Sequence, residues 1–373
     1  MRQCEVVIAG AGVAGASLAY FLTRAGVRDV VVLEREGAPA RHASGRSAEV
    51  LVEIEPDPTW QPLVAEGARF LRQPPPGFAP APLLRATGEL NLLGAGERDE
   101  LAAALPALAR QGIAVEILEP DEVRRRHPFI TEPELAGASW LPGSGRIAVR
   151  ALIAGYLDRA REAGAELWLD AGVSAVEREA GRVTGVVTAR GPLGCRTLVC
   201  AAGAWAGELA ALAGALPVRM QPLRRTVISF DAPAGTAVAD WPLIADESRH
   251  IYVAPEGDGL LACPMDEDPI EPCDAQPHPA FIELARERLR RLAAPLSPAH
   301  IRSARAGLRT FAPDRRLVMG RDPVRPGFFW LAGQGGCGIE TSPAVGRMAA
   351  DLIARGATSD PELAAMLSPQ RFA

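Results

Sequence analysis

A glycine-rich turn near the start of the chain has the residue types and spacing that bind a dinucleotide. A short apolar segment leads into Gly10, Gly12 and Gly15. In this pattern the first glycine allows a tight turn, the second lets the backbone approach a pyrophosphate, and the third lets a helix pack on the sheet. A second apolar segment ends in Glu34, where a carboxylate can accept a hydrogen bond from a ribose hydroxyl. The sequence therefore predicts a nucleotide site at residues 4–34.

Two further segments have the composition of ligand-binding loops. Residues 41–48 are small and polar and follow the second apolar segment, so they can lie along a bound cofactor. Residues 333–338 contain four glycines between an apolar strand and a helix. Glycine runs of this kind place backbone N–H groups against a ligand. The nucleotide unit comes first and the second glycine turn comes last, so we expect the two ends of the chain to build one domain.

The periodicity of apolar residues predicts an α/β protein with an α+β insertion. The chain turns β-rich from about residue 218. We expect helices at 14–25, 59–73, 97–111, 150–163, 280–293 and 343–354. We expect strands at 4–8, 30–33, 83–93, 113–117, 166–169, 173–177, 183–188, 197–202, 225–230, 250–254, 260–264 and 328–332.

Composition excludes several classes of protein. The net charge of −5 gives no basic surface for nucleic acid, and no apolar run is long enough to span a membrane. The six cysteines show no paired spacing and the five histidines form no HxxxH pair, so we predict neither disulfides nor a metal site. The N-terminus lacks the pattern of a signal peptide. We expect a cytoplasmic protein and leave open whether it attaches to the membrane periphery.

Several motifs together resemble the FAD-dependent D-amino-acid oxidase superfamily, which includes glycine and sarcosine oxidases. Within it, the bacterial D-arginine dehydrogenases are the members that the segments resemble most. The motifs are GAGVAGAS at 10–17, ASGRSA at 43–48, LVCAAGAW at 198–205, AGLRTF at 306–311 and FFWLAGQGGCGIETS at 328–342. The resemblance covers nearly the whole chain.

This resemblance implies a Rossmann-like FAD-binding domain with an inserted α+β substrate-binding domain. The expected FAD domain combines residues 1–82, 145–217 and 305–373, and the substrate domain combines 83–144 and 218–304. FAD is expected to bind non-covalently, because no cysteine occupies the family's attachment position near Thr310. The expected cofactor-binding residues are Gly10, Gly12, Val13, Ala14, Gly15, Glu34, Arg35, Ala43, Ser44, Gly45, Arg46, Ser47, Val173, Ala202, Gly203, Trp205, Gly307, Arg309, Gly335, Gly336, Cys337, Gly338, Ile339 and Glu340.

The resemblance also assigns roles in catalysis. Arg309 is expected to pair with the substrate carboxylate, because a guanidinium fork bonds both oxygens at once. Tyr252 is expected to reach the same carboxylate, and Arg225, with Arg224 as its alternative, to line the pocket. Glu89 matches the acidic residue that meets a cationic side chain in D-arginine dehydrogenases. Gly336 is expected to lie at the reaction site.

The implied reaction is oxidation of a D-amino acid by hydride transfer to flavin N5. The imino acid formed then hydrolyses to a 2-oxo acid and ammonia. Oxidation of glycine, sarcosine or another secondary amino acid, or of a 2-hydroxy acid, stays an alternative. The electron acceptor is a quinone, another carrier or O2. Two departures, Leu51 and Cys337 in place of family tyrosines, predict a less polar pocket.

Overall fold

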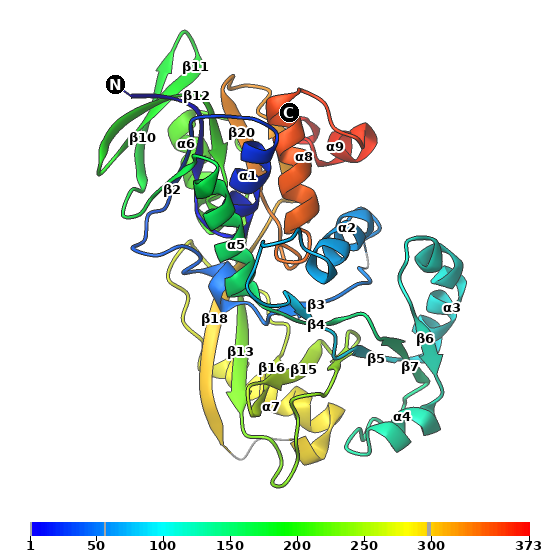
Figure 1. Ribbon diagram of the computed structural model, residues 1–373. Helices are drawn as coiled ribbons and strands as arrows, with labels where there is room; N and C mark the ends of the chain where they lie inside the picture. Colours follow the sequence, from blue (N-terminus) through cyan, green and yellow to red (C-terminus); the bar gives the residue numbers. More distant parts are fainter. Residues whose placement is uncertain (1, 56, 297–299) are drawn as a thin grey trace.

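Two large sheets and a small one form the framework of the molecule (Figure 1). The computed structural model describes residues 2–55, 57–296 and 300–373. One large sheet lies at the end of the molecule where both chain termini are found, and the other lies at the opposite end. Helices pack on both sheets. No helix among these described residues is long and apolar enough to cross a membrane.

The first sheet carries the nucleotide motif. Its central strand, β1 (Arg2–Ala9), pairs in parallel with β2 (Val30–Leu33) and with β12 (Gly191–Cys200). β12 also pairs in parallel with β20 (Phe328–Ala332), so the two ends of the chain share this sheet, as the sequence predicts. The remaining strands are β9 (Glu166–Trp168), β10 (Val173–Glu179), β11 (Arg182–Thr188) and β19 (Val318–Arg321).

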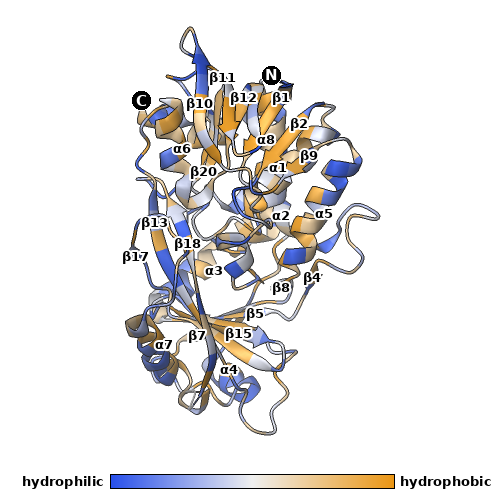
Figure 2. Ribbon diagram, turned by 90° about the vertical axis from the view of Figure 1, so that its left-hand side faces the viewer, coloured by the Kyte–Doolittle hydropathy of each residue, from blue (hydrophilic) through white to orange (hydrophobic). Residues whose placement is uncertain are grey.

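Helices cover both faces of this sheet because its strands are apolar on both sides (Figure 2). In β1, Val6 and Ile8 pack in the core formed with α1 (Val13–Arg24) and α8 (Ser342–Ala354). Val7 and Ala9 face the opposite core, which contains α6 (Ala206–Ala213). The other helices around this sheet are α2 (Gln61–Arg72), α5 (Val149–Glu162) and α9 (Pro361–Leu367).

The second sheet supplies the long strand that reaches the cofactor loops. Its strand order is β17-β13-β16-β15-β14-β5-β7-β6, and β18 (Ile301–Phe311) pairs antiparallel with β13 (Gln221–Phe230). β18 also packs against the 3₁₀ turns at Ala43–Arg46 and Gly203–Trp205. The other strands are β5 (Glu89–Leu93), β6 (Glu116–Leu118), β7 (Gly137–Leu141), β14 (Leu243–Asp246), β15 (Ile251–Glu256), β16 (Gly259–Cys263) and β17 (Asp268–Pro269).

Three helices and a small sheet complete the fold. α7 (Pro279–Leu292) packs on the second sheet, and α3 (Ala95–Arg110) and α4 (Pro120–Arg126) contact its far end. The small sheet consists of β3 (Val50–Leu51), β8 (Gly145–Ile147) and β4 (Leu84–Arg85).

The α/β fold class is confirmed, but one predicted strand is wrong. Residues 83–93 form two short strands, β4 and β5, in different sheets. Gly88 separates them with φ +86°, and a Cβ there would lie 2.0 Å from the Trp140 ring. The expected strand at 113–117 begins later, at Glu116. β7, β14 and β18 were not foreseen, and the domain boundaries stay a prediction.

Gly67 of α2 marks a close contact that a methyl group would disrupt. A Cβ at this position would lie 1.7 Å from the carbonyl oxygen of Glu340, in the second glycine loop. We expect Gly67→Ala to lower the free energy of unfolding by about 1–3 kcal/mol, because overpacking forces the backbone apart. Chemical denaturation measures the change. Gly207→Ala in α6 is the control, since nothing lies within 4 Å of its Cβ position; an equal loss there would contradict the argument.

Candidate functional site

The first glycine turn is closed by contacts that only glycine permits. Gly10 has φ +115°, and a Cβ there would lie 2.3 Å from the carbonyl oxygen of Ala201. A Cβ at Gly15 would lie 1.9 Å from the carbonyl oxygen of Gly10. Gly12 differs, because only Ser44 Oγ, at 3.3 Å, lies near its Cβ position. Gly10 and Gly15 therefore shape the turn, whereas at Gly12 only the Ser44 hydroxyl limits a side chain.

The Glu34 carboxylate holds this turn against the next strand. It is buried at the end of β2, accepts from the Ala11 N–H at 2.9 Å, and accepts from the Glu36 N–H at 3.0 Å. Ser44 Oγ accepts from the N–H of Val13 at 3.0 Å, so the loop at 41–48 lies on the start of α1. These contacts fix the turn before any ligand arrives.

Two adjoining cavities, of about 390 and 1070 Å³, share the glycine turn and the 41–48 loop. The smaller lies over Glu34, Arg35 and Trp205, and the larger extends along β18 to the second sheet. The predicted cofactor residues line one or both cavities, except Gly15 and Gly45, which pack against backbone. Their shared lining residues are Gly12, Ala43, Ser44, Arg46, Ala201, Gly203, Gly307 and Leu308.

Arg309 lines the larger cavity without a counter-ion. It lies on β18 opposite Leu223 of β13, and its guanidinium lies against Gly336, where a Cβ would be only 2.8 Å from Nη1. Among the described residues it forms no ion pair. A cation in this position is suited to bind an anionic ligand group.

Arg225 and Tyr252 line the same cavity from neighbouring strands. Arg225 is 9% exposed, donates to Glu267 Oε1 at 3.1 Å, and has a buried Nε without a partner. Burial, followed by the charge of Arg309, lowers the pKa of Arg225. Burial raises the pKa of Tyr252, which keeps its phenol neutral and able to donate. Arg224, the alternative to Arg225, pairs with Asp268 outside the cavity lining.

Glu89 is a buried carboxyl that lines the cavity at the start of β5. It is 1% exposed, and burial raises its pKa to about 8. Oε1 accepts from Asn91 Nδ2 at 3.0 Å, whereas Oε2 has no hydrogen-bond partner. An unsatisfied buried carboxyl oxygen is costly, so its placement favours a ligand donor.

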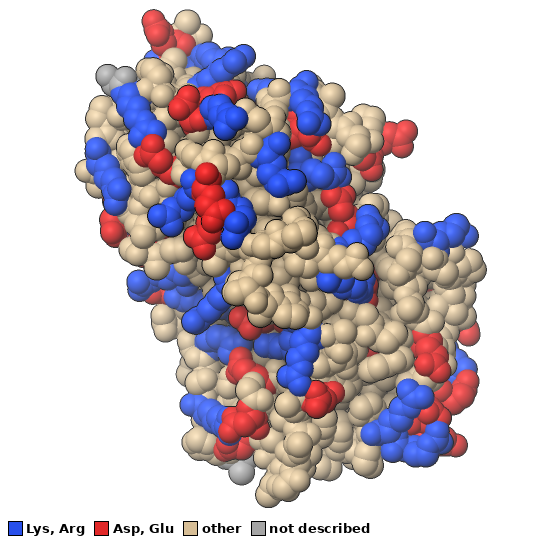
Figure 3. Space-filling model, viewed as in Figure 1, with Lys and Arg blue, Asp and Glu red and all other residues tan. Residues whose placement is uncertain are grey.

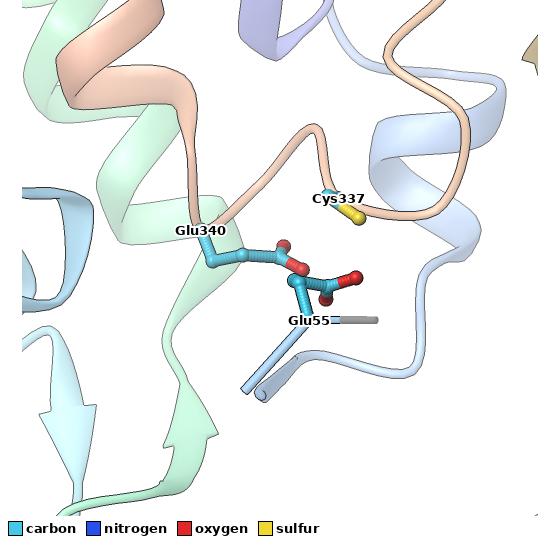
Figure 4. Close-up of side chains that lie close together, drawn as sticks. All are labelled: Glu55, Cys337 and Glu340. Atoms are coloured by element: carbon cyan, nitrogen blue, oxygen red, sulfur yellow. The ribbon is translucent and has the colours of Figure 1, made fainter. Parts of the chain in front are cut away.

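Two carboxyl groups and one thiol that no sequence pattern brings together also lie close to one another in this cavity. A carboxyl oxygen of Glu55, a carboxyl oxygen of Glu340 and Sγ of Cys337 lie within 4.8 Å of one another, and Figure 4 shows the two carboxyl groups side by side. Burial raises the pKa of Glu55 to about 7 and that of Glu340 to about 8. Burial also raises the pKa of Cys337 well above its usual value. Glu55 follows a two-residue strand, so no sequence pattern marks it.

The expectation of a less polar pocket is wrong. Leu51 is fully buried in the core with α1 and α5 and lines neither cavity. Cys337 does line the larger cavity, but beside two carboxyl groups. Glu247, whose pKa burial also raises, adds another carboxyl to the same lining. Carboxyl groups and arginines therefore share the lining of this pocket.

The outer surface carries both signs of charge. Figure 3 shows positive and negative side chains interspersed over the face that it presents. Many of them are paired, as in the Arg2–Glu166 and Arg347–Glu66 ion pairs. A mixed surface of this kind gives no basic stripe for nucleic acid on that face.

Comparison with known proteins places the chain in a family. A model described as FAD dependent oxidoreductase (DAO) matches residues 5–352. The chain belongs to this family of FAD-dependent oxidoreductases. Two solved structures share its fold: L-proline dehydrogenase from P. horikoshii (TM-score 0.88, 22% identity, 100% and 98% of the two chains) and glycine oxidase from Geobacillus kaustophilus (0.82, 25%, 99% and 98%).

Two curated relatives are similar over most of this chain. The mitochondrial pyruvate dehydrogenase phosphatase regulatory subunit of Mus musculus is 27% identical over 96% of the chain. Sarcosine oxidase subunit beta of Rhizobium meliloti (strain 1021) is 26% identical over 95% of it. The chain spans 42% of the mouse protein but 85% of the bacterial subunit.

The residues present fit FAD, the cofactor of this family. The turn that only glycine can form, the Gly12 position that only the Ser44 hydroxyl limits, and the buried Glu34 suit the pyrophosphate and ribose of its adenosine half. The smaller cavity over Glu34 leads into the larger one, where a flavin ring would lie within reach of the second glycine loop. Non-covalent attachment stays a prediction.

Gly12→Val tests the space beside the turn. We expect loss of FAD binding, because the new side chain would fill the pyrophosphate position. Within the protein itself, only the Ser44 hydroxyl would have to shift by a small amount to admit a Cβ there. The flavin released by denaturation, measured by absorbance, should fall to near zero, whereas the unfolding midpoint of apoprotein should change little. Wild-type FAD content in this variant would contradict the assignment.

Proposed function

We propose that the chain oxidises the carbon–nitrogen bond of an amino acid, with a D-amino acid as the first candidate substrate. The observation that carries the proposal is the half-buried Arg309, which forms no ion pair with any described residue and lines one cavity together with Arg225, Tyr252 and several carboxyl groups. A ligand with both a carboxylate and an amine matches such a lining. Membership of the FAD family supplies the reaction class.

The side chains of the cavity would bind and orient the substrate. Arg309 and Arg225 would hold the carboxylate, with Tyr252 donating a hydrogen bond from its neutral phenol. Glu89 would accept from a cationic group at the other end of the substrate. FAD, when bound, would supply the oxidising power for removal of a hydride from the substrate's α-carbon. The imino acid then hydrolyses in water to a 2-oxo acid and ammonia.

A secondary amino acid is the second candidate. It is favoured by the similarity to sarcosine oxidase subunit beta over most of both chains. Arg309 would hold the carboxylate of either substrate, so the arginines do not distinguish them. A 2-hydroxy acid fits less well, because its hydroxyl leaves the carboxyl groups without a cation.

Anaerobic reduction of the bound flavin decides between these substrates. Flavin bleaching is followed with D-amino acids, L-amino acids, N-methyl amino acids and 2-hydroxy acids. The proposal expects rapid bleaching with D-amino acids. Bleaching by N-methyl amino acids alone supports the second candidate, and no bleaching by any amine contradicts the proposal. The electron acceptor, a quinone, another carrier or O2, is then found by reoxidation.

Arg309→Leu should leave FAD bound and remove most activity. A charge-assisted pair contributes roughly 1.5–3 kcal/mol, so we expect kcat/KM to fall about tenfold to several hundredfold. Steady-state assay with the best amino acid measures the loss. Arg302→Leu is the control, because Arg302 lies on the same strand and pairs with Asp231 and Asp258 away from the cavity. Equal rates in wild type and Arg309→Leu would place the carboxylate elsewhere.

Glu89→Gln should change substrate preference. We expect a selective loss of kcat/KM of about tenfold on D-arginine with little change on D-methionine, since one charge-assisted bond is lost. Assays on both substrates provide the internal control. An equal effect on the two would mean that Glu89 does not meet the substrate's side chain.

A further inference from the structure

The carboxyl groups of Glu55 and Glu340 lie where the nitrogen of the proposed substrate would contact them. Arg309 lies against Gly336, and Cys337 is the next residue along the same loop. Glu340 and Glu55 lie within 4.8 Å of the Cys337 thiol. In an α-amino acid only one carbon separates the carboxylate from the nitrogen. A carboxylate bound by Arg309 therefore brings its nitrogen to the region of this pair.

The lining of the cavity independently points to a ligand that carries both charges. Arg225 Nε is buried, has no partner and lines the cavity, which favours an anionic group on the ligand. Glu89 Oε2 is buried and accepts no hydrogen bond from the described residues, and Glu89 lines the same cavity, which favours a cationic donor on the ligand. Arg225 belongs to β13 and Glu89 to β5, so both lie outside the loops that contain Glu55 and Glu340.

We propose that Glu55 and Glu340 together receive a proton from the substrate's ammonium group and so generate the neutral amine that is oxidised. The inference rests on the proposed amino-acid substrate. The proton passes from ammonium nitrogen to a carboxylate oxygen, giving one amine and one carboxylic acid, with no change in oxidation state. This step is needed because the C=N bond forms from the nitrogen lone pair, which an ammonium lacks.

The electrostatic surroundings allow the pair to hold and release a proton near neutral pH. Two carboxyl groups this close cannot both ionise easily, so they titrate as a unit. Burial raises the pKa of Glu55 to about 7 and of Glu340 to about 8. The positive charge of Arg309 acts in the opposite direction and lowers the pKa of both carboxyl groups. The acidic groups that also act on the pair are Glu247 on Glu55, Glu89 on Glu340, and the Cys337 thiol.

An ammonium group fits this site better than a metal ion. The raised pKa of Cys337 keeps its thiol protonated, and a thiol binds metals well only as thiolate. The guanidinium of Arg309 also contributes a positive charge at the pair. A single positive charge that can lose its proton suffers less repulsion there than a divalent ion.

The pH dependence of flavin reduction tests the proposal. The holoenzyme is reduced anaerobically by the amino acid that bleaches it fastest, and the second-order rate is measured from about pH 6 to about pH 10, a range that includes the expected titration and the higher pH to which it would move. In wild type we expect the rate to rise with an apparent pKa between those of the pair, at about 7 to about 8. In either single variant, Glu55→Gln or Glu340→Gln, the rise should move to lower pH because the remaining carboxyl loses its neighbour's charge, whereas in the double variant it should move up toward the pKa of the substrate ammonium. The rate of the double variant at neutral pH should then fall about 100-fold.

Glu134→Gln is the matched control, because this exposed carboxylate lies outside both cavities. It should leave the profile unchanged. A wild-type pH profile in both Glu55→Gln and Glu340→Gln overturns the proposal. If one of the two loses FAD, the other variant decides.

Infrared spectroscopy gives a second readout that needs no substrate. The carbonyl stretch of a protonated carboxyl group should disappear from the wild-type spectrum as pH rises through about 7 to about 8. Part of this signal should be missing in Glu55→Gln and Glu340→Gln. An unchanged titration in both variants overturns the proposal. If no amino acid reduces the flavin, the proposed function fails while the infrared result still reports on the pair.

Discussion

Burial of opposite charges around one cavity is the constraint on which the candidate site depends. Arg225 and Arg309 line this cavity together with Glu55, Glu89 and Glu340. Charged groups removed from water are costly unless they are paired, and these carboxyls respond by holding protons near neutral pH. A ligand that brings one carboxylate and one amine satisfies both kinds of group, so the same imbalance that costs stability favours binding.

Glu53 shows what this chain does with a buried carboxylate that has only a structural role. It lies near the cavity, is almost fully buried, and pairs with Arg72 at 2.5 Å. It also accepts a hydrogen bond from Ser144. Glu89 lies close enough to feel the charge of Glu53 but has no such arginine. The contrast supports assigning Glu89 to a ligand rather than to the fold.

The cofactor half of the site was predictable because its signals are local in sequence. Gly10, Gly12 and Glu34 belong to one strand–turn–helix–strand unit, whose spacing alone specifies the turn. Arg309 was found only through the resemblance of its segment to the family, since an arginine in a strand has no special pattern. Leu51 shows the limit of that transfer. The resemblance placed it at the pocket, but the fold turns its side chain into the core.

The acidic lining of the substrate half could not be derived from local sequence patterns, because its groups meet only after the two sheets are assembled; Glu89 and Glu340 were named only through the family resemblance, and Glu55 was missed. Glu55 follows β3 of the small sheet, Glu89 begins β5 of the second sheet, and Glu340 precedes α8 on the first. Their raised pKa values come from burial that no window of sequence contains. Gly67 allows close packing at this site, because the absence of a side chain lets α2 approach the backbone of Glu340. The acidic pair therefore depends on the packing of α2 as well as on its own residues, since a change at Gly67 acts on the backbone of Glu340.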